Sequence, residues 1–150
     1  MRFVWFLVVC CLSVPQVAVA APKRHKGALA HALPVAVNRV IDGDTLEVTA
    51  QTWLDTMTTA VVRVAGIDTP ELRTKCAQEK ALALRAKHTL EALVSAQNHR
   101  LVLHDIRRGT YAGRVIARVM TEDGANIADT LISQGLARSY DGKQKRAPWC

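Results

Sequence analysis

The sequence predicts a single α+β domain that is mainly β, built as a small five-stranded barrel with two or three helices. Two observations favour this fold class. Short runs of apolar and β-branched residues recur along the chain with turn residues between them. One longer segment, residues 77–96, instead repeats apolar residues at the spacing of a helix face. A chain of 150 residues suffices for one hydrophobic core.

The first 20 residues have the features of a signal peptide. Arg2 precedes an apolar run, residues 3–14, and Ala18-Val19-Ala20 supplies small residues at a cleavage site. The apolar run is short for a membrane span. We therefore expect export, to the periplasm or the medium, with cleavage after Ala20 and no stable membrane insertion afterwards. An uncleaved anchor, or a lipoprotein at Cys10 or Cys11, is the alternative.

Residues 21–34 are interpreted as a flexible basic tether, and residues 35–150 as the folded domain. The tether is rich in Ala and His and shows no apolar period. The first 20 residues carry only one charge, Arg2, so their removal changes the net charge from +7 to +6. A basic exported protein is compatible with a nucleic acid, an anionic lipid or an acidic polymer as its partner, but net charge alone indicates none of them.

The first three strands are predicted around a tight hairpin. Asp42-Gly43-Asp44 separates residues 35–41 from residues 45–49, and Asp-Gly between two such runs indicates a two-residue turn. Residues 51–59 are expected to form a looser connection. Residues 59–65 are predicted as the third strand, which is buried because it is nearly all apolar.

Two helices are predicted from apolar spacing and from their ends. The apolar face of residues 77–96 consists of Ala83, Ala86, Leu90, Leu93 and Val94. Asn126 is expected to cap a second, short helix, which ends at Gly135. The apolar side of that helix is Ile127, Leu131 and Ile132.

The last two strands are predicted at residues 100–103 and 114–120, with the basic Arg107-Arg108-Gly109 in the loop between them. Five strands with a helix between the third and the fourth is the order of an OB-fold barrel. This order predicts the architecture, but a fold alone does not fix a function.

Charged residues gather at the ends of these predicted strands. They are Asp42 and Asp44 in the first turn, Arg63 on the third strand, Asp68, Thr69 and Glu71 after it, and Arg114 at the start of the fifth strand. Carboxylates bind hard divalent cations, and a cation with arginine forks stabilises the negative charge that develops during attack on a phosphodiester. A further carboxylate can activate water. Taken singly, the aspartates are also turn formers and Arg63 an ordinary paired strand residue.

Five short motifs occur in a fixed order along the chain. They are Val40-Ile41-Asp42-Gly43-Asp44-Thr45, Val62-Arg63-Val64, Gly66-Ile67-Asp68-Thr69-Pro70-Glu71, Gly113-Arg114 and Gly135-Leu136-Ala137. Together they resemble the successive signatures of the staphylococcal nuclease-like (thermonuclease) family, from about Val37 to the C-terminus. The fold that this resemblance implies, an OB barrel with helices, agrees with the strand order.

The resemblance implies roles for these residues. Asp44 and Asp68 would bind Ca²⁺, in preference to Mg²⁺, through their carboxylates, and Thr69 through its main-chain carbonyl. Asp42 would support Asp44 and the metal. Glu71 would position or activate the attacking water. The remaining two, Arg63 and Arg114, would clamp the scissile phosphate, with Arg114 also serving the leaving group. The implied substrates are DNA and RNA, cleaved at the 5′ P–O bond to leave 3′-phosphates.

The chain departs from the family pattern just before Arg114. It reads Thr110-Tyr111-Ala112-Gly113-Arg114, whereas the family commonly has Asp-x-Tyr-Gly-Arg. The acidic residue is missing and the tyrosine stands one position early. Tyr111 and Tyr140 are therefore the candidate contacts to the nucleotide.

Cys76 and Cys150 remain once the first 20 residues are removed. Two cysteines in an exported chain most simply pair with each other, although free thiols or an intermolecular bridge are the alternatives. A Cys after the Pro-Glu turn together with a terminal Trp-Cys also resembles small exported bacterial members of the family. Trp53 and Trp149 are expected to be packing residues.

The sequence thus predicts an exported, monomeric, Ca²⁺-dependent nuclease. The alternative is a catalytically silent OB module that binds nucleic acid or a protein partner. A third possibility is a polyanion-binding or cell-surface-binding protein that acts through its tether. The carboxylate–arginine set favours the enzyme, since a binding module has no need of it.

Overall fold

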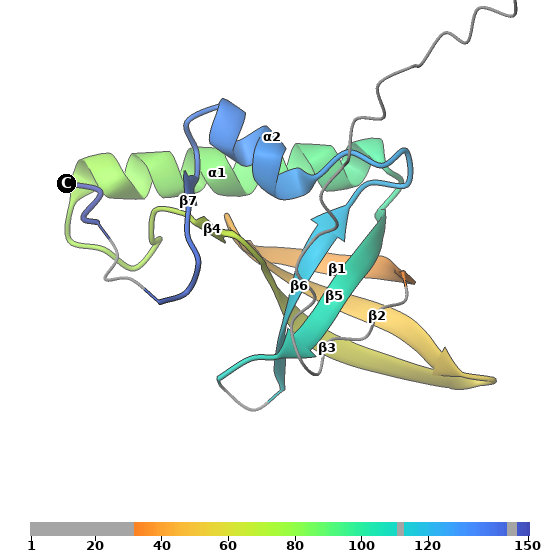
Figure 1. Ribbon diagram of the computed structural model, residues 1–150. Helices are drawn as coiled ribbons and strands as arrows, with labels where there is room; N and C mark the ends of the chain where they lie inside the picture. Colours follow the sequence, from red (N-terminus) through yellow and green to blue (C-terminus); the bar gives the residue numbers. More distant parts are fainter. Residues whose placement is uncertain (1–31, 111–112, 144–146) are drawn as a thin grey trace, which may run out of the picture.

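The computed structural model describes residues 32–110, 113–143 and 147–150. Its centre is a closed barrel with the strand order β1-β2-β3-β6-β5 (Figure 1). The strands are β1 (Leu33–Asp42), β2 (Thr45–Trp53), β3 (Thr56–Val64), β5 (Arg100–Arg108) and β6 (Arg114–Met120). All neighbours are antiparallel except β3 and β6, which are parallel. The structure confirms the predicted mainly-β OB barrel.

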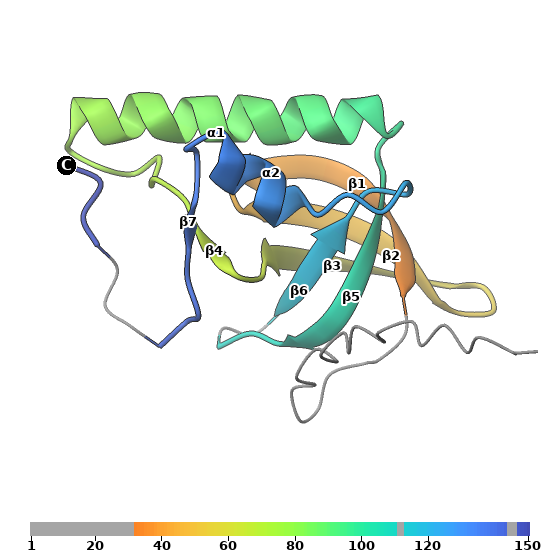
Figure 2. The same ribbon diagram turned by 45° about the horizontal axis from the view of Figure 1, so that its top comes forward.

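The hydrophobic core fills the barrel and continues beneath two helices. The helices α1 (Ala77–Ala96) and α2 (Ile127–Ser133) lie on the same side of the barrel, over one end of it (Figures 1 and 2). The largest fully buried side chains are Leu46, Ile67, Leu90, Leu101, Ile127 and Leu131, which come from strands and from both helices. In the part of the chain that the structure describes, no helix is long and apolar enough to cross a membrane.

Both helices begin at side-chain caps. Sγ of Cys76 accepts a hydrogen bond from the Glu79 N–H at the start of α1, and Oδ1 of Asn126 accepts one from the Ala128 N–H at the start of α2. Such caps satisfy N–H groups that have no partner inside the helix. Gly135 follows α2 at φ 68°, a conformation that favours glycine. The expected Asn126 cap and Gly135 stop are confirmed.

The predicted apolar face of α1 is confirmed, while that of α2 is confirmed only in part. Four of the five expected α1 residues are buried, and Leu93 packs partly buried against the core. On α2, Ile127 and Leu131 are buried but Ile132 is exposed. The short α2 turns only a narrow stripe towards the barrel, and Ile132 lies beside that stripe.

The expectation of a loose connection at residues 51–59 is wrong. β2 and β3 continue as a long hairpin, with Trp53 paired to Thr56 across the turn. Threonines stabilise it, because β-branched side chains favour strands and the Thr52 and Thr58 hydroxyls lie 2.9 Å apart across it. Trp53 is 73% exposed at the tip, so its expected packing role is also wrong.

The expected loop at residues 107–109 is wrong as well. β5 runs to Arg108, and Arg107 pairs with Ile116 of β6. The ladder is irregular between His104 and Arg107, where Asp105 has φ 51°. An extra residue of this kind bends a strand without ending it. The polar residues at the irregularity concealed the second half of the strand.

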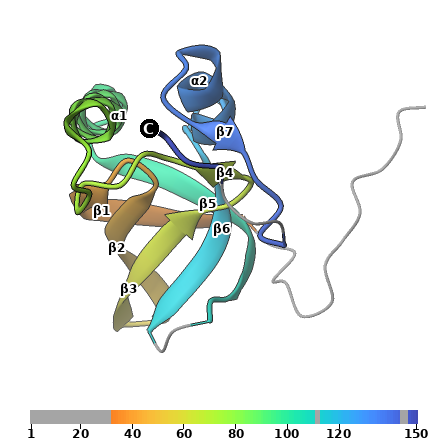
Figure 3. The ribbon, with the colours of Figure 1, turned by 90° about the vertical axis from the view of Figure 1, so that its left-hand side faces the viewer.

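A second, two-stranded sheet was not predicted. It pairs β4 (Ile67–Asp68) with β7 (Arg138–Ser139), and so brings β7 beside the turn that follows β3 (Figures 1 and 3). Strands of two residues show no periodicity, and their pairing spans half of the chain. Residues 33 and 34 already belong to β1, so this part of the expected tether is barrel; residues 1–31 lie outside the described residues.

Candidate active site

The candidate site begins at the turn between β1 and β2. The Gly43 N–H donates a hydrogen bond to Oδ1 of Asp42. A Cβ atom on Gly43 would lie 2.8 Å from the Cβ of Ala86 and 3.1 Å from Oγ1 of Thr69. Because real Cβ atoms do not approach this closely, the glycine allows the turn to pack directly against α1 and Thr69. The turn is therefore fixed by packing as well as by its hairpin geometry.

Asp44 is buried, and side chains of β2 and β3 contact its carboxylate. Its Oδ1 accepts hydrogen bonds from Oγ1 of Thr45 at 2.8 Å and from Nη1 of Arg63 at 3.1 Å. Nη2 of Arg63 lies 2.8 Å from the other oxygen, Oδ2. The main-chain carbonyl of Asp44 accepts from the Val64 N–H at 2.8 Å. These contacts hold the carboxylate in one orientation at the end of the barrel.

Arg63 also reaches a second buried carboxylate. Its Nη2 lies 3.6 Å from Oδ1 of Asp68, which is 5% exposed. The neighbouring Thr69 is equally inaccessible, at 3%. One guanidinium therefore stands between two buried aspartates that are 24 positions apart in the sequence. The structure brings Asp44, Arg63 and Asp68 together as the sequence indicated.

Burial makes this cluster electrostatically unfavourable when its carboxylates are ionised. Burial raises the pKa of Asp44, an effect that the Arg63 guanidinium opposes and that Asp42 and Glu71 reinforce. Burial likewise raises the pKa of Asp42, which the Gly43 N–H opposes and Glu71 reinforces. Asp42, Asp44 and Glu71 are thus close enough to repel one another. A cation placed among them would relieve that repulsion.

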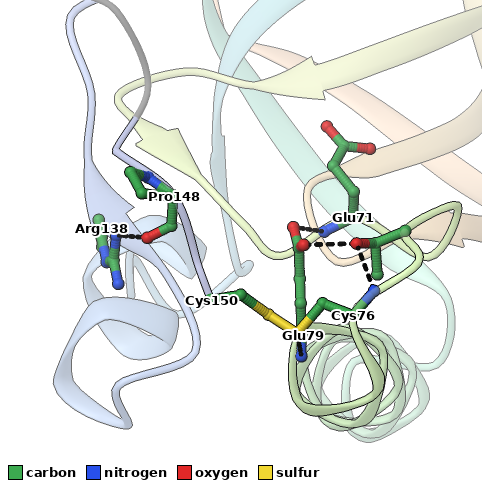
Figure 4. Close-up of a disulfide and its surroundings, with 7 residues drawn as sticks. Glu71, Cys76, Glu79, Arg138, Pro148 and Cys150 are labelled. Carbon is green, nitrogen blue, oxygen red and sulfur yellow. Dashed lines mark hydrogen bonds between the residues drawn. A yellow bond between two sulfur atoms is a disulfide. The ribbon is translucent and has the colours of Figure 1, made fainter.

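Glu71 lies at the solvent side of the cluster. Its side chain is exposed, and Figure 4 shows it directed away from the Cys76–Cys150 bridge. Its main-chain N–H donates to Oε1 of Glu79 at 3.2 Å, and Oε2 of Glu79 accepts from Oγ1 of Thr74 at 2.6 Å. Glu79 on α1 therefore braces the backbone that carries Glu71.

A pocket of about 200 Å³ shares Arg63 with this cluster. Among its lining residues are Arg63, Arg107, Arg114 and Tyr140. The parallel pairing of β3 with β6 places Val61 opposite Arg114 and Arg63 opposite Ile116, so the two expected arginines lie close together on adjacent strands. The pocket thus combines three arginines with one aromatic ring and one carboxylate, Asp141, and it meets the buried aspartates at Arg63.

A family model described as staphylococcal nuclease homologue matches residues 61–148, which is more than half of the chain. The chain belongs to the staphylococcal nuclease homologue family. The expected resemblance is confirmed. The match starts on β3, so it contains Arg63, Asp68, Glu71 and Arg114 but not the β1–β2 turn. The contact between Arg63 and Asp44 joins that turn to the matched region.

A curated relative shows the same relationship over a longer stretch. The SPbeta prophage-derived endonuclease YokF of Bacillus subtilis (strain 168) is 33% identical to this chain over 104 residues. The matched stretch is 69% of this chain and 33% of YokF, so the chain spans about a third of that relative's length.

The donor set of this staphylococcal nuclease homologue fits a hard divalent cation. Within the described ranges, no group of three or more His, Cys, Asp or Glu side chains forms a metal cage. The expected ligands are instead two carboxylates, from Asp44 and Asp68, and the carbonyl of Thr69. Both carboxylates are buried, and oxygen donors of this kind suit Ca²⁺.

Two residues near the site were missed in the sequence, and one expected residue is not described. Arg107 enters the pocket only because of the irregularity in β5. Trp149 donates an indole hydrogen bond to Asp68. The sequence did hold a signal for this contact, because the neighbouring Cys150 is bridged to Cys76, close to the Pro-Glu turn that follows Asp68. Tyr140 lines the pocket, whereas Tyr111 lies outside the described residues.

Proposed function

We propose that this protein is an exported, Ca²⁺-dependent nuclease that hydrolyses phosphodiester bonds in DNA and RNA at the 5′ P–O bond, leaving 3′-phosphates. One observation carries the proposal. The Arg63 guanidinium contacts both buried aspartates and also lines the pocket that contains Arg114. A site for a cation and a site for a phosphate therefore share one side chain.

The phosphate is bound by the arginine pocket. The guanidinium groups of Arg63 and Arg114 donate paired N–H groups, whose geometry matches the oxygens of a phosphodiester. Arg107 also lines this pocket and adds a contact to the sugar-phosphate backbone. Tyr140 offers a ring to the attached nucleotide.

The carboxylates divide into two tasks. Asp44, Asp68 and the carbonyl of Thr69 hold the cation, and Asp42 supports them from the turn. When bound, Ca²⁺ acts as a Lewis acid on a phosphoryl oxygen. Glu71 is exposed and close to Asp42 and Asp44, and a carboxylate in this position can orient a water and accept its proton.

Two further observations support the proposed activity and its place of action. The matched relative is named an endonuclease. Export rests on the first 20 residues of the sequence and is consistent with a disulfide, because such bridges persist in oxidising compartments.

The proposal is tested on residues 21–150 with single-stranded DNA, duplex DNA and RNA, each in Ca²⁺, in Mg²⁺ and in chelator. We expect cleavage that requires Ca²⁺ and leaves products carrying 3′-phosphates, identified by their resistance to 3′ extension until a phosphatase removes them. Binding without cleavage under every metal would contradict the proposal and favour the silent OB module. Products with 3′-hydroxyls would contradict the assigned bond.

A further inference from the structure

Residues 147–150, which we call the C-terminal segment, are tied to the site by contacts that the function described so far does not use. Nη1 of Arg138 donates to the carbonyl of Pro148 at 3.1 Å, and its guanidinium lies 3.8 Å from the centroid of the Trp149 ring. Cys150 is bridged to Cys76 at the start of α1 (Figure 4). Trp149 is therefore held by the preceding β7 on one side and by a covalent bond on the other.

The polar end of Trp149 is directed at a candidate metal ligand. Its Nε1–H donates a hydrogen bond of 3.2 Å to Oδ2 of Asp68, across a sequence separation of 81 residues. The other carboxylate oxygen, Oδ1, faces Nη2 of Arg63 at 3.6 Å. The two oxygens of Asp68 are thus contacted by different parts of the chain, a strand of the barrel and the C-terminal segment. A carboxylate held in this way has its rotation about χ2 restricted.

Hydrogen bonds behind a metal ligand fix its orientation, and their loss typically weakens metal binding about 10-fold to 100-fold. We propose that Trp149 is a positioning residue for Asp68, and that the Cys76–Cys150 bridge keeps it in place, so that the oxidised protein binds Ca²⁺ more tightly than the reduced protein. The proposal rests on the cation site of the proposed function.

Besides the bridge, the contacts described for residues 147–150 are non-covalent and few. Residues 147, 148 and 150 are exposed, and only Trp149 is partly buried. The contacts of Arg138 with Pro148 and Trp149 lie at the surface, where water competes with them. Reduction adds two electrons and two protons to the sulfurs, breaks the S–S bond and leaves two thiols. The segment is then free to leave Asp68.

The first arm of the test removes the indole donor and keeps an aromatic ring. Trp149→Phe is compared with Trp53→Phe, since Trp53 is exposed at the tip of the β2–β3 hairpin, at the opposite end of β3 from Arg63. Ca²⁺ binding to residues 21–150 is measured by titration calorimetry. We expect the Kd of Trp149→Phe to rise about 10-fold or more and that of Trp53→Phe to stay within about twofold of the wild type. Equal Kd values for Trp149→Phe and the wild type would overturn the proposal.

The second arm tests the bridge with Cys76→Ser/Cys150→Ser. Serine at position 76 keeps an oxygen acceptor for the Glu79 N–H, so the cap of α1 survives while the bridge is lost. We expect this variant to bind Ca²⁺ about as weakly as Trp149→Phe. A phosphine reductant should weaken Ca²⁺ binding by the wild type to the same level and leave Ca²⁺ binding by the serine variant unchanged. The phosphine is oxidised to the phosphine oxide, with an oxygen from water. Tight binding after reduction would overturn the role of the bridge.

A spectroscopic readout follows the contact itself. The sequence has three tryptophans, and Trp5 lies within the first 20 residues, so residues 21–150 carrying Trp53→Phe contain Trp149 alone. Reduction should shift its emission to longer wavelength as the indole becomes hydrated; an unchanged spectrum would contradict release. If the wild type cleaves and binds Ca²⁺ but Trp149→Phe binds equally well, only this inference fails. If the oxidised wild type binds no Ca²⁺, the cation site of the proposed function fails with it.

Discussion

At the scale of the residue, the contact between Arg63 and Asp44 is compatible with a structural role and with a catalytic role. An arginine paired with a buried aspartate is an ordinary structural ion pair, and the 2.8 Å contact with Asp44 has that geometry. The same side chain also approaches Asp68 and lines the pocket with Arg114. A purely structural pair requires neither of these, so the wider neighbourhood favours a catalytic role.

Arg63→Lys tests that role while keeping the charge. Lysine retains the positive charge beside the aspartates but loses the planar fork, so we expect kcat to fall about 100-fold or more with the fold intact. Arg39→Lys is the matched control, because Arg39 pairs with Glu47 on the exposed surface. Single-turnover rates and thermal melts of both variants measure the effect. A rate for Arg63→Lys close to that of the wild type would refute the assigned role.

Asp42→Asn tests the electrostatic cost of the site. Burial raises the pKa of Asp42 in the folded state, so its contribution to stability is fully present below the unfolded pKa and is lost as the pH rises through the folded pKa. Asparagine does not ionise and can still accept from the Gly43 N–H. In chelator at pH 7 the variant should therefore melt at a higher temperature than the wild type.

That difference in melting temperature should shrink as the pH is lowered through the pKa of Asp42. Melts across the pH range in chelator measure it. A lower melting temperature for Asp42→Asn at pH 7 would show that the ionised carboxylate is stabilising in the metal-free protein.

At the scale of the element, the sequence predicted the features that are encoded locally and missed those that interrupt a strand pattern or depend on distant pairing. The turn at Asp42-Gly43-Asp44 and the helix at residues 77–96 were predicted because both are local: a turn has its own residue types, and a helix its own period. The second half of β5 was not predicted, because the irregularity between His104 and Arg107 interrupts the strand pattern. Pairing over long distances, as between β4 and β7, leaves no local trace.

The irregularity in β5 has a functional consequence that can be tested. Arg107 lines the pocket, whereas the adjacent Arg108 is exposed and does not. We expect Arg107→Ala to lower kcat/KM about 10-fold and to reduce the dependence of substrate binding on salt concentration, since one phosphate contact is lost. Arg108→Ala is the matched control and should stay within about twofold of the wild type. Equal losses of kcat/KM in both variants would show that substrate binding depends on the overall charge and not on the position of Arg107.

At the scale of the whole molecule, the C-terminal segment contacts the candidate site and is bridged to the start of α1. The strand order and the ordered motifs predicted the barrel and the meeting of Asp44, Arg63 and Asp68. They did not predict that the chain returns through β7 and Trp149 to Asp68, although the pairing of Cys76 with Cys150 was expected. The return depends on tertiary contacts that no periodicity encodes.

The bridge should also stabilise the fold. It joins residues 74 positions apart, and the loop-entropy model gives about 4 kcal/mol as an upper value. We expect Cys76→Ser/Cys150→Ser to lower the melting temperature by about 10 °C in chelator. Calorimetry of the oxidised wild type and the variant measures this difference. An unchanged melting temperature would argue that the bridge constrains only the last few residues.

The single-turnover cleavage rate of Glu71→Gln in Ca²⁺ shows whether these carboxylates and arginines form a hydrolytic centre. Glutamine keeps the size of the side chain and removes its ability to accept a proton, so we predict a rate about 100-fold to 10,000-fold below that of the wild type, with melting temperature and Ca²⁺ affinity little changed. Glu122→Gln, at an exposed pair with Arg100, should cleave like the wild type. A Glu71→Gln rate near that of the wild type would show that Glu71 does not accept a proton from the attacking water.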